Sequence, residues 1–126
     1  MFVAPRKHPR LRSNHPGEVE ILLPGEPGAP QKVCIPVTIR SVSSEGVGVA
    51  LEGRPERAPG RGDTVTMRIA ARETPMELPG RVAWFNDQHK YPIHLGIHLQ
   101  LEFARSSMRH AFAHWVVDLS RSQLGG

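Results

Sequence analysis

The chain has 126 residues, a net charge of +4 at neutral pH and a single cysteine, Cys34. This length fits one domain with its own hydrophobic core, and one cysteine excludes an internal disulfide and favours a reducing compartment. The N-terminus carries no apolar signal segment, and no apolar run reaches membrane-spanning length, so we expect a cytoplasmic protein.

Residues 1–14 are expected to form a flexible basic arm that precedes the first strand. The stretch PRKHPRLRSN, residues 5–14, combines two prolines with four cationic side chains and shows no apolar periodicity. Such a segment has little to pack on in the free protein, and its charge suits an anionic ligand.

Six short strands are predicted between residues 15 and 102 from the alternation of apolar and polar side chains. They cover residues 18–23, 32–40, 47–51, 64–69, 77–84 and 93–101. In the second, Pro36 lies on the outward face and indicates an edge strand, because proline cannot donate a hydrogen bond to a neighbouring strand. Six strands at near-regular spacing predict an all-β fold, a closed or nearly closed barrel.

From residue 103 to residue 121 the apolar pattern changes to that of an amphipathic helix. The apolar stripe of this helix consists of Met108, Ala111, Phe112, Trp115, Val116 and Leu119. We expect the helix to lie across the barrel or to cover one of its mouths, and residues 122–126 to fray.

The sequence offers no convincing catalytic or metal-binding constellation. His110 and His114 are four residues apart on the predicted helix, but they share it with several arginines, so we interpret them as part of a polar face. His94 and His98 lie about 13 Å apart along a strand, at ~3.3 Å per residue, and cannot share one ion. We therefore expect a protein that is not an enzyme and holds neither a metal nor a cofactor.

Four short motifs, taken together, resemble the PilZ domain, a bacterial receptor module for the second messenger cyclic di-GMP (c-di-GMP). The first is the pair Arg6 and Arg10, spaced as RxxxR, and the second is SVSSEG, residues 41–46. GRVAW at 80–84 and LGIHL at 95–99 resemble two later strands of that family. The resemblance implies a six-stranded antiparallel β-barrel over residues 15–102 with a C-terminal helix.

The same resemblance implies a c-di-GMP site made from the arm and from the turn after the second strand. The arm would contribute Arg6, Lys7 and Arg10, since a guanidinium group can pair with phosphate, donate to guanine and stack on a ring. The turn would contribute Ser41, Ser43 and Gly46. For Trp84 two interpretations stay open: a stacking partner for the ligand, or a residue of the barrel core.

Ser41 stands where the family has aspartate or asparagine. The loss of one charge-assisted hydrogen bond costs about 1.5–3 kcal/mol, which corresponds to roughly ten- to a hundredfold in affinity. Glu45 could partly replace the missing carboxylate if the turn directs it inward. We expect binding to be weakened by this difference and not abolished.

The function predicted from the sequence is that of a non-enzymatic c-di-GMP receptor, which changes its surface on binding and so signals to an unknown protein partner. The alternative is an adaptor of the same family that does not bind the nucleotide and acts through protein–protein contacts. Nucleic acid is disfavoured as a partner, because only 6% of the residues are aromatic and no basic stripe accompanies them.

Overall fold

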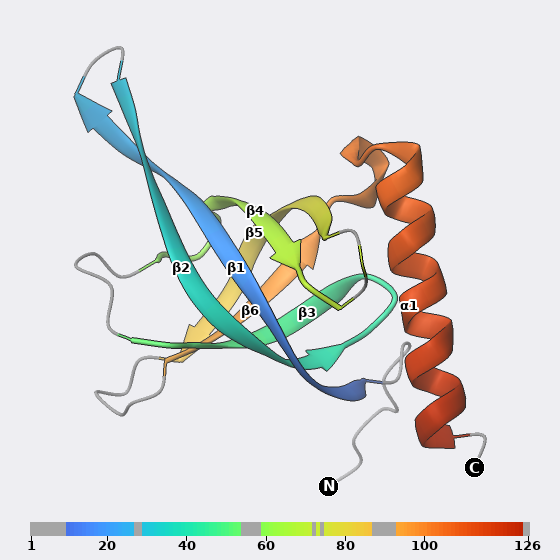
Figure 1. Ribbon diagram of the computed structural model, residues 1–126. Coiled ribbons are helices and arrows are strands. Elements are labelled where there is room, and N and C mark those ends of the chain that lie inside the picture. Colours follow the sequence, from blue (N-terminus) through green and yellow to red (C-terminus); the bar gives the residue numbers. More distant parts are fainter. Residues whose placement is uncertain are drawn as a thin grey trace, which may run out of the picture.

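The computed structural model describes residues 10–26, 29–53, 59–71, 73, 75–86 and 93–124. Within these residues, six antiparallel strands form a closed barrel in the order β1-β2-β3-β6-β5-β4, followed by one helix (Figure 1). The elements are β1 (Leu11–Glu26), β2 (Ala29–Val42), β3 (Gly46–Leu51), β4 (Thr64–Ile69), β5 (Met76–Asn86), β6 (His94–Leu99), the short 3-10 helix η1 (Leu101–Phe103) and α1 (Ser106–Leu124). The predicted fold class is confirmed.

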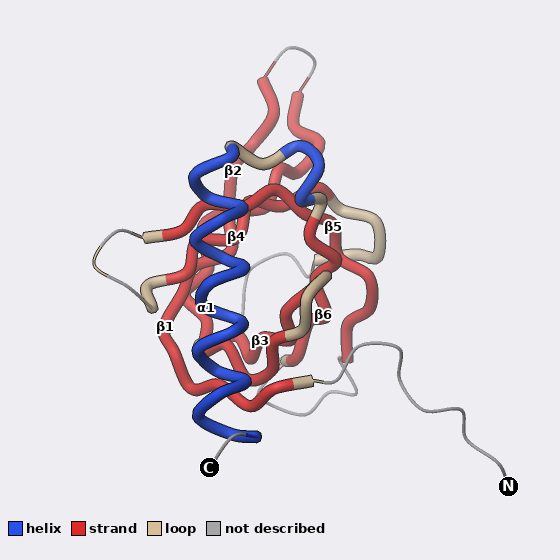
Figure 2. The backbone as a smooth tube through the Cα atoms, turned by 90° about the vertical axis from the view of Figure 1, so that its right-hand side faces the viewer, coloured by secondary structure: helices blue, strands red, loops and turns tan. Residues whose placement is uncertain are grey.

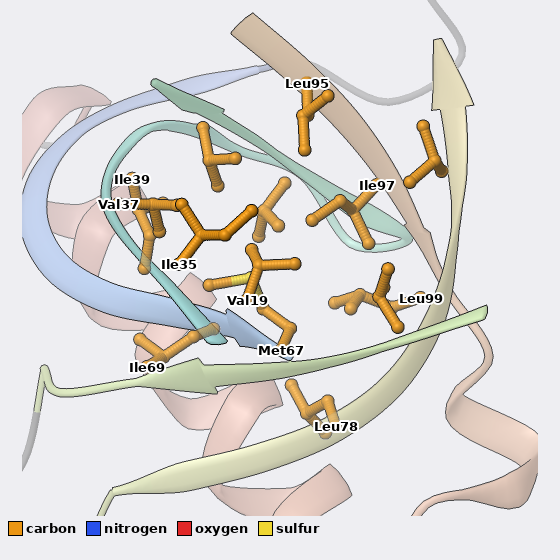
Figure 3. Close-up of a cluster of buried hydrophobic side chains, with 14 of the residues drawn as sticks. Val19, Ile35, Val37, Ile39, Met67, Ile69, Leu78, Leu95, Ile97 and Leu99 are labelled. Atoms are coloured by element: carbon orange, nitrogen blue, oxygen red, sulfur yellow. The ribbon is translucent and has the colours of Figure 1, made fainter. Parts of the chain in front are cut away.

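The core of the barrel is filled by the inward side chains that the alternation predicts. Val19 and Met67 are fully buried, and they lie among side chains from β2, β5 and β6 (Figure 3). The residues labelled in that view are Val19, Ile35, Val37, Ile39, Met67, Ile69, Leu78, Leu95, Ile97 and Leu99. Close packing of these aliphatic groups is the main favourable term in the stability of the barrel.

The start of the first strand and both ends of the helix differ from the expected boundaries. β1 begins at Leu11, inside the segment 1–14 that was expected to be an arm, because Leu11 is buried and pairs with Val42 of β2. Residues 1–9 lie outside the described part of the chain. The helix begins at Ser106 and not at residue 103, since Ala104 has an extended backbone that separates α1 from η1. It continues to Leu124, past the predicted end at residue 121.

The prediction that Pro36 marks an edge strand is wrong. β2 has β1 on one side and β3 on the other, as closure of the barrel requires. Pairing with β3 starts at Val37, one residue after the proline, and the Pro36 carbonyl accepts a hydrogen bond from the Glu52 amide at 2.9 Å. The missing N–H of Pro36 therefore falls just beyond the paired stretch, where it costs no ladder hydrogen bond.

The helix lies over one mouth of the barrel, and Figure 2 shows it crossing the ring of strands. Phe112 and Trp115 are the buried residues of α1, and their rings meet edge to face at 6.1 Å between centroids. Trp115 also contacts the ring of His15 in β1 at 5.4 Å. The predicted apolar stripe thus closes the end of the core.

Among the described helices, none is both long and apolar enough to cross a membrane.

The outer face of β1, β4 and β5 carries an ion-pair cluster centred on Arg68. Its guanidinium donates to Glu18 at 2.9 Å, to Glu77 at 3.4 Å and to Glu20, and Lys32 approaches Glu20 at 3.5 Å. The hydrogen bond from Arg68, followed by the attraction of its charge, lowers the pKa of Glu20 below its usual value. The folded state therefore favours the ionised form of Glu20.

A Glu20→Gln substitution tests this cluster through the pH dependence of stability. Because the pKa of Glu20 is lowered by folding, its contribution is complete above the unfolded value near 4.5 and is lost as the pH falls through the folded value. We expect the variant to lose about 1 kcal/mol of unfolding free energy at pH 7, and progressively less in acid, as measured by urea denaturation across a pH series. Glu102→Gln, at an exposed site, is the control, and an effect of Glu20→Gln that did not change with pH would contradict the assignment.

Candidate binding site

A pocket of about 220 Å³ lies on the outside of the barrel, between the turn that joins β2 to β3 and the outer face of β5 and β6. It brings together five of the seven predicted site residues: Arg10, Ser41, Ser43, Gly46 and Trp84. The other two, Arg6 and Lys7, lie outside the described residues. Residues that the sequence reasoning did not assign also line the pocket: Val47, Gly48, Ala83, Gly96, Ile97 and His98.

The floor of the pocket is a row of four residues that are paired across four neighbouring strands. Ser41 of β2 pairs with Gly48 of β3, Gly48 with Gly96 of β6, and Gly96 with Trp84 of β5. Gly48 and Gly96 have inward-facing, buried neighbours on both sides, so their own missing side chains leave the outer face hollow. The Ser41 hydroxyl occupies this space above Gly48, and the Trp84 indole occupies it above Gly96.

Trp84 belongs to the pocket and not to the barrel core. Simple alternation would place it on the same face as Leu78 and Val82, but β5 gains one residue relative to β6 between Val82 and Trp84. Such a bulge turns the following side chain to the other face. Trp84 is accordingly 40% exposed, whereas Val82 is buried. Of the two interpretations left open by the sequence, the core residue is excluded.

The absence of a side chain at Gly96 allows the Trp84 indole to pack against the backbone of β6. A Cβ atom at Gly96 would lie 2.1 Å from the indole Nε1 and 2.2 Å from Cε2, far inside contact distance. The ring therefore rests directly on the β6 backbone, which holds one of its faces and leaves part of the side chain exposed in the pocket. In the sequence, this contact is indicated by Gly96 itself, because a glycine at an outward strand position often marks the close approach of another group.

Ser41 reaches the outer face by a second bulge. β2 gains one residue relative to β3 between Ile39 and Ser41, so that Arg40 and Ser41 both point outward before Val42 returns to the core. Arg10 then donates from Nη1 to the Ser41 hydroxyl at 3.5 Å. A Cβ atom at Gly48 would lie 2.5 Å from that hydroxyl oxygen, so only glycine leaves room for the pair.

The turn SVSSEG is closed by Ser43. Its hydroxyl donates to the carbonyl of Gly46 at 3.3 Å and accepts from the amide of Glu45 at 3.4 Å. Gly46 is required for a close approach: a Cβ atom there would lie 2.6 Å from the carbonyl oxygen of Ile97. Its backbone does not have the positive φ that the structure gives to Gly53 and Gly62. Glu45 is also among the residues that line the pocket.

The chemistry of the pocket is that of a binding site for an anion with a planar group. Arg10 supplies a charged fork of hydrogen-bond donors, Trp84 an aromatic face, and Ser41 a hydroxyl.

Within the described residues, no group of three or more His, Cys, Asp or Glu side chains could hold a metal ion. Cys34 lies on a different face of the barrel, where desolvation, the larger cause, and Glu18 raise the pKa of its thiol and so reduce its reactivity.

Comparison with known proteins gives one family and several similar folds. The sequence model of the PilZ domain family matches residues 4–117, and no curated protein sequence matches the chain. The PilZ domain of YcgR from Escherichia coli, solved with c-di-GMP, has a TM-score of 0.65 and 12% identity, and the alignment covers 93% of this chain and 92% of that one.

Two longer proteins contain a similar fold. The inhibitor of motility MotI/DgrA from Bacillus subtilis has a TM-score of 0.62 and 13% identity, over 97% of this chain and 54% of that one. MrkH from K. pneumonia, in a c-di-GMP complex, has a TM-score of 0.63 and 12% identity, over 98% and 56%. The chain thus spans about half the length of these two proteins. At such identities the similarity shows the fold alone.

The contact between Gly96 and Trp84 can be tested by a double-mutant cycle. We expect Gly96→Ala to lower the unfolding free energy by about 1–3 kcal/mol, because the added methyl group displaces the indole. In a Trp84→Leu background the same change should cost less than about 1 kcal/mol, which chemical denaturation can measure. Gly60→Ala, where a Cβ atom would meet only ordinary contacts, is the control. Equal costs in both backgrounds would show that the ring does not rest on Gly96.

Proposed function

This chain belongs to the PilZ domain family, and on that premise we propose that it is a non-enzymatic receptor that binds c-di-GMP in the pocket between the β2–β3 turn and Trp84. The observation that carries the proposal is the convergence of Arg10, Ser41, Ser43 and Trp84 on one pocket, although they come from segments far apart in the sequence. A cytoplasmic location, as expected from the sequence, is part of the proposal.

The groups around the pocket match the ligand by class. c-di-GMP carries two phosphodiester charges and two guanines, each with a flat face and an edge of donors and acceptors. Arg10 would pair with a phosphate or with the O6 and N7 atoms of a guanine. Trp84 would stack on a guanine face, and Ser41 and Glu45 would accept hydrogen bonds from its edge.

The size of the pocket limits how much of the ligand it can enclose. Its volume of about 220 Å³ is below the ~300–1,000 Å³ of sites that surround a drug-sized ligand. We therefore expect the pocket to hold one guanine with its adjoining phosphate. Arg6 and Lys7, in the segment before Arg10, would cover the remainder of the ligand.

Binding would change the surface of the protein around the start of β1. The ligand would neutralise the positive charge of the segment before β1 and bridge it to the SVSSEG turn, so that the segment and ligand together present a new surface to a protein partner. Such an output needs no catalytic group. The chemistry of that partner is not specified by the pocket.

An adaptor that does not bind the nucleotide is the second candidate function. The observation that favours it is Ser41, which replaces the carboxylate or amide found in the family with a single hydroxyl. The Ser43 hydroxyl is already engaged within its own turn. The two candidates differ in one measurable property, the affinity for c-di-GMP.

Calorimetric titration with c-di-GMP separates the two candidates. We expect binding by the wild-type chain and at least about tenfold weaker binding by Arg10→Ala, since the variant loses a charge-assisted contact. Arg105→Ala is the matched control, because Arg105 is exposed and lines a different depression, beside Phe103. No heat from the wild type at about 0.5 mM ligand would overturn the receptor and favour the adaptor.

The cost of Ser41 can be measured by restoring the carboxylate. We expect Ser41→Asp to tighten c-di-GMP binding by about ten- to a hundredfold, because aspartate can accept two hydrogen bonds from a guanine edge. Ser44→Asp adds the same charge at an exposed neighbouring position and should have little effect. If both variants changed the affinity alike, the effect would be one of net charge and not of this contact.

A further inference from the structure

The start of β1 has an edge that no described strand covers. β4 pairs with β1 only from Gly17 to Ile21, and Pro16 accepts one further hydrogen bond, from the Ala70 amide at 3.1 Å. Before that point the last turn of α1 lies beside β1, in the two perpendicular views of Figures 1 and 2. The backbone groups of β1 at this edge are therefore free of partners from the described strands and lie within reach of the helix.

Gln123 in the last turn of α1 supplies those partners for Arg12. Its side-chain Nε2 donates to the Arg12 carbonyl at 2.6 Å, and its Oε1 accepts from the Arg12 amide at 2.8 Å. A primary amide has the same donor and acceptor as a peptide group, so Gln123 occupies the place of a neighbouring strand. This contact joins residues that are 111 positions apart in the sequence.

Arg12 lies at the boundary of the pocket. It is the cross-strand partner of Ser41, and Arg10, two residues earlier, reaches the Ser41 hydroxyl. Directly after Arg12, β1 gains one residue relative to β2 before pairing resumes between His15 and Ile39. A bulge interrupts the ladder at this point, so the backbone that carries Arg10 is held by two pairs with β2, by buried Leu11 and by the Gln123 amide.

We propose that Gln123 is a positioning residue for the binding pocket: by holding both backbone groups of Arg12, it sets where the guanidinium of Arg10 meets Ser41. The inference rests on the proposed function for its ligand, but the placement of Arg10 is a property of the free protein. Coupling of this kind is reciprocal, so a ligand that fixes Arg10 also stabilises the last turn of α1.

The first experiment is calorimetric titration of the full chain with c-di-GMP. The variant Gln123→Met keeps the length and volume of the side chain and removes both hydrogen bonds. We expect it to bind about three- to tenfold more weakly than the wild type, the effect of losing about one net hydrogen bond from the bound state. Ser122→Ala is the control, because the Ser122 hydroxyl donates only within its own helix, to Leu119. Equal affinity of Gln123→Met and wild type would overturn the inference and leave the receptor function intact.

The second experiment uses amide NMR and hydrogen exchange without any ligand, so that the inference can be judged separately from the receptor function. Gln123→Met should speed exchange of the Arg12 amide and shift the amide signals of Ser41 and Gly48, which lie around Arg10. A general loss of helix stability would instead speed exchange throughout α1. Unchanged Ser41 and Gly48 signals would overturn the inference, whatever the titration shows for the wild type.

Discussion

Closure of the barrel is the constraint on which the rest of the structure depends. A closed ring gives every strand a neighbour on each side, and along the regular stretches of each strand the side chains point alternately into the core and out to solvent. Inward positions are filled by aliphatic residues, while an outward cation such as Arg68 meets carboxylates on both adjoining strands. A proline is tolerated inside β2 only because it sits where pairing with β3 has ended.

The candidate site lies where that alternation is interrupted. β1 gains a residue after Arg12, β2 after Ile39, and β5 after Val82. Two of these bulges turn Ser41 and Trp84 out of the series of inward residues, and the third lies next to the segment that carries Arg10. Bulges re-aim side chains at the expense of ladder hydrogen bonds. Here they bring three polar or aromatic groups to one face of the barrel.

Room for the Ser41 and Trp84 side chains comes from two glycines. Gly48 and Gly96 are paired across β3 and β6, and a methyl group on either would collide with Ser41 or Trp84. The same strands carry large aliphatic residues on their inner face, so the hollow weakens neither the core nor its closure by Phe112 and Trp115. The barrel, the pocket and the helix share the start of β1, and this makes the pocket sensitive to a contact made at the far end of the chain.

The sequence by itself determined the inward residues of the regular strand stretches, the apolar stripe of the helix and, through short motifs, four residues of the pocket: Arg10, Ser41, Ser43 and Gly46. These depend on local patterns, which a single chain displays directly. Only the tertiary structure decided that Trp84 lies outside the core, that Gly48 faces Gly96, and that Gln123 holds Arg12. The first two depend on strand register, which is set by contacts between distant segments, and each bulge moves the following side chains to the other face. The third depends on how the end of the helix packs beside β1. Periodicity along one strand carries no information about its neighbour, and for that reason the pattern alone could place the core but not complete the site.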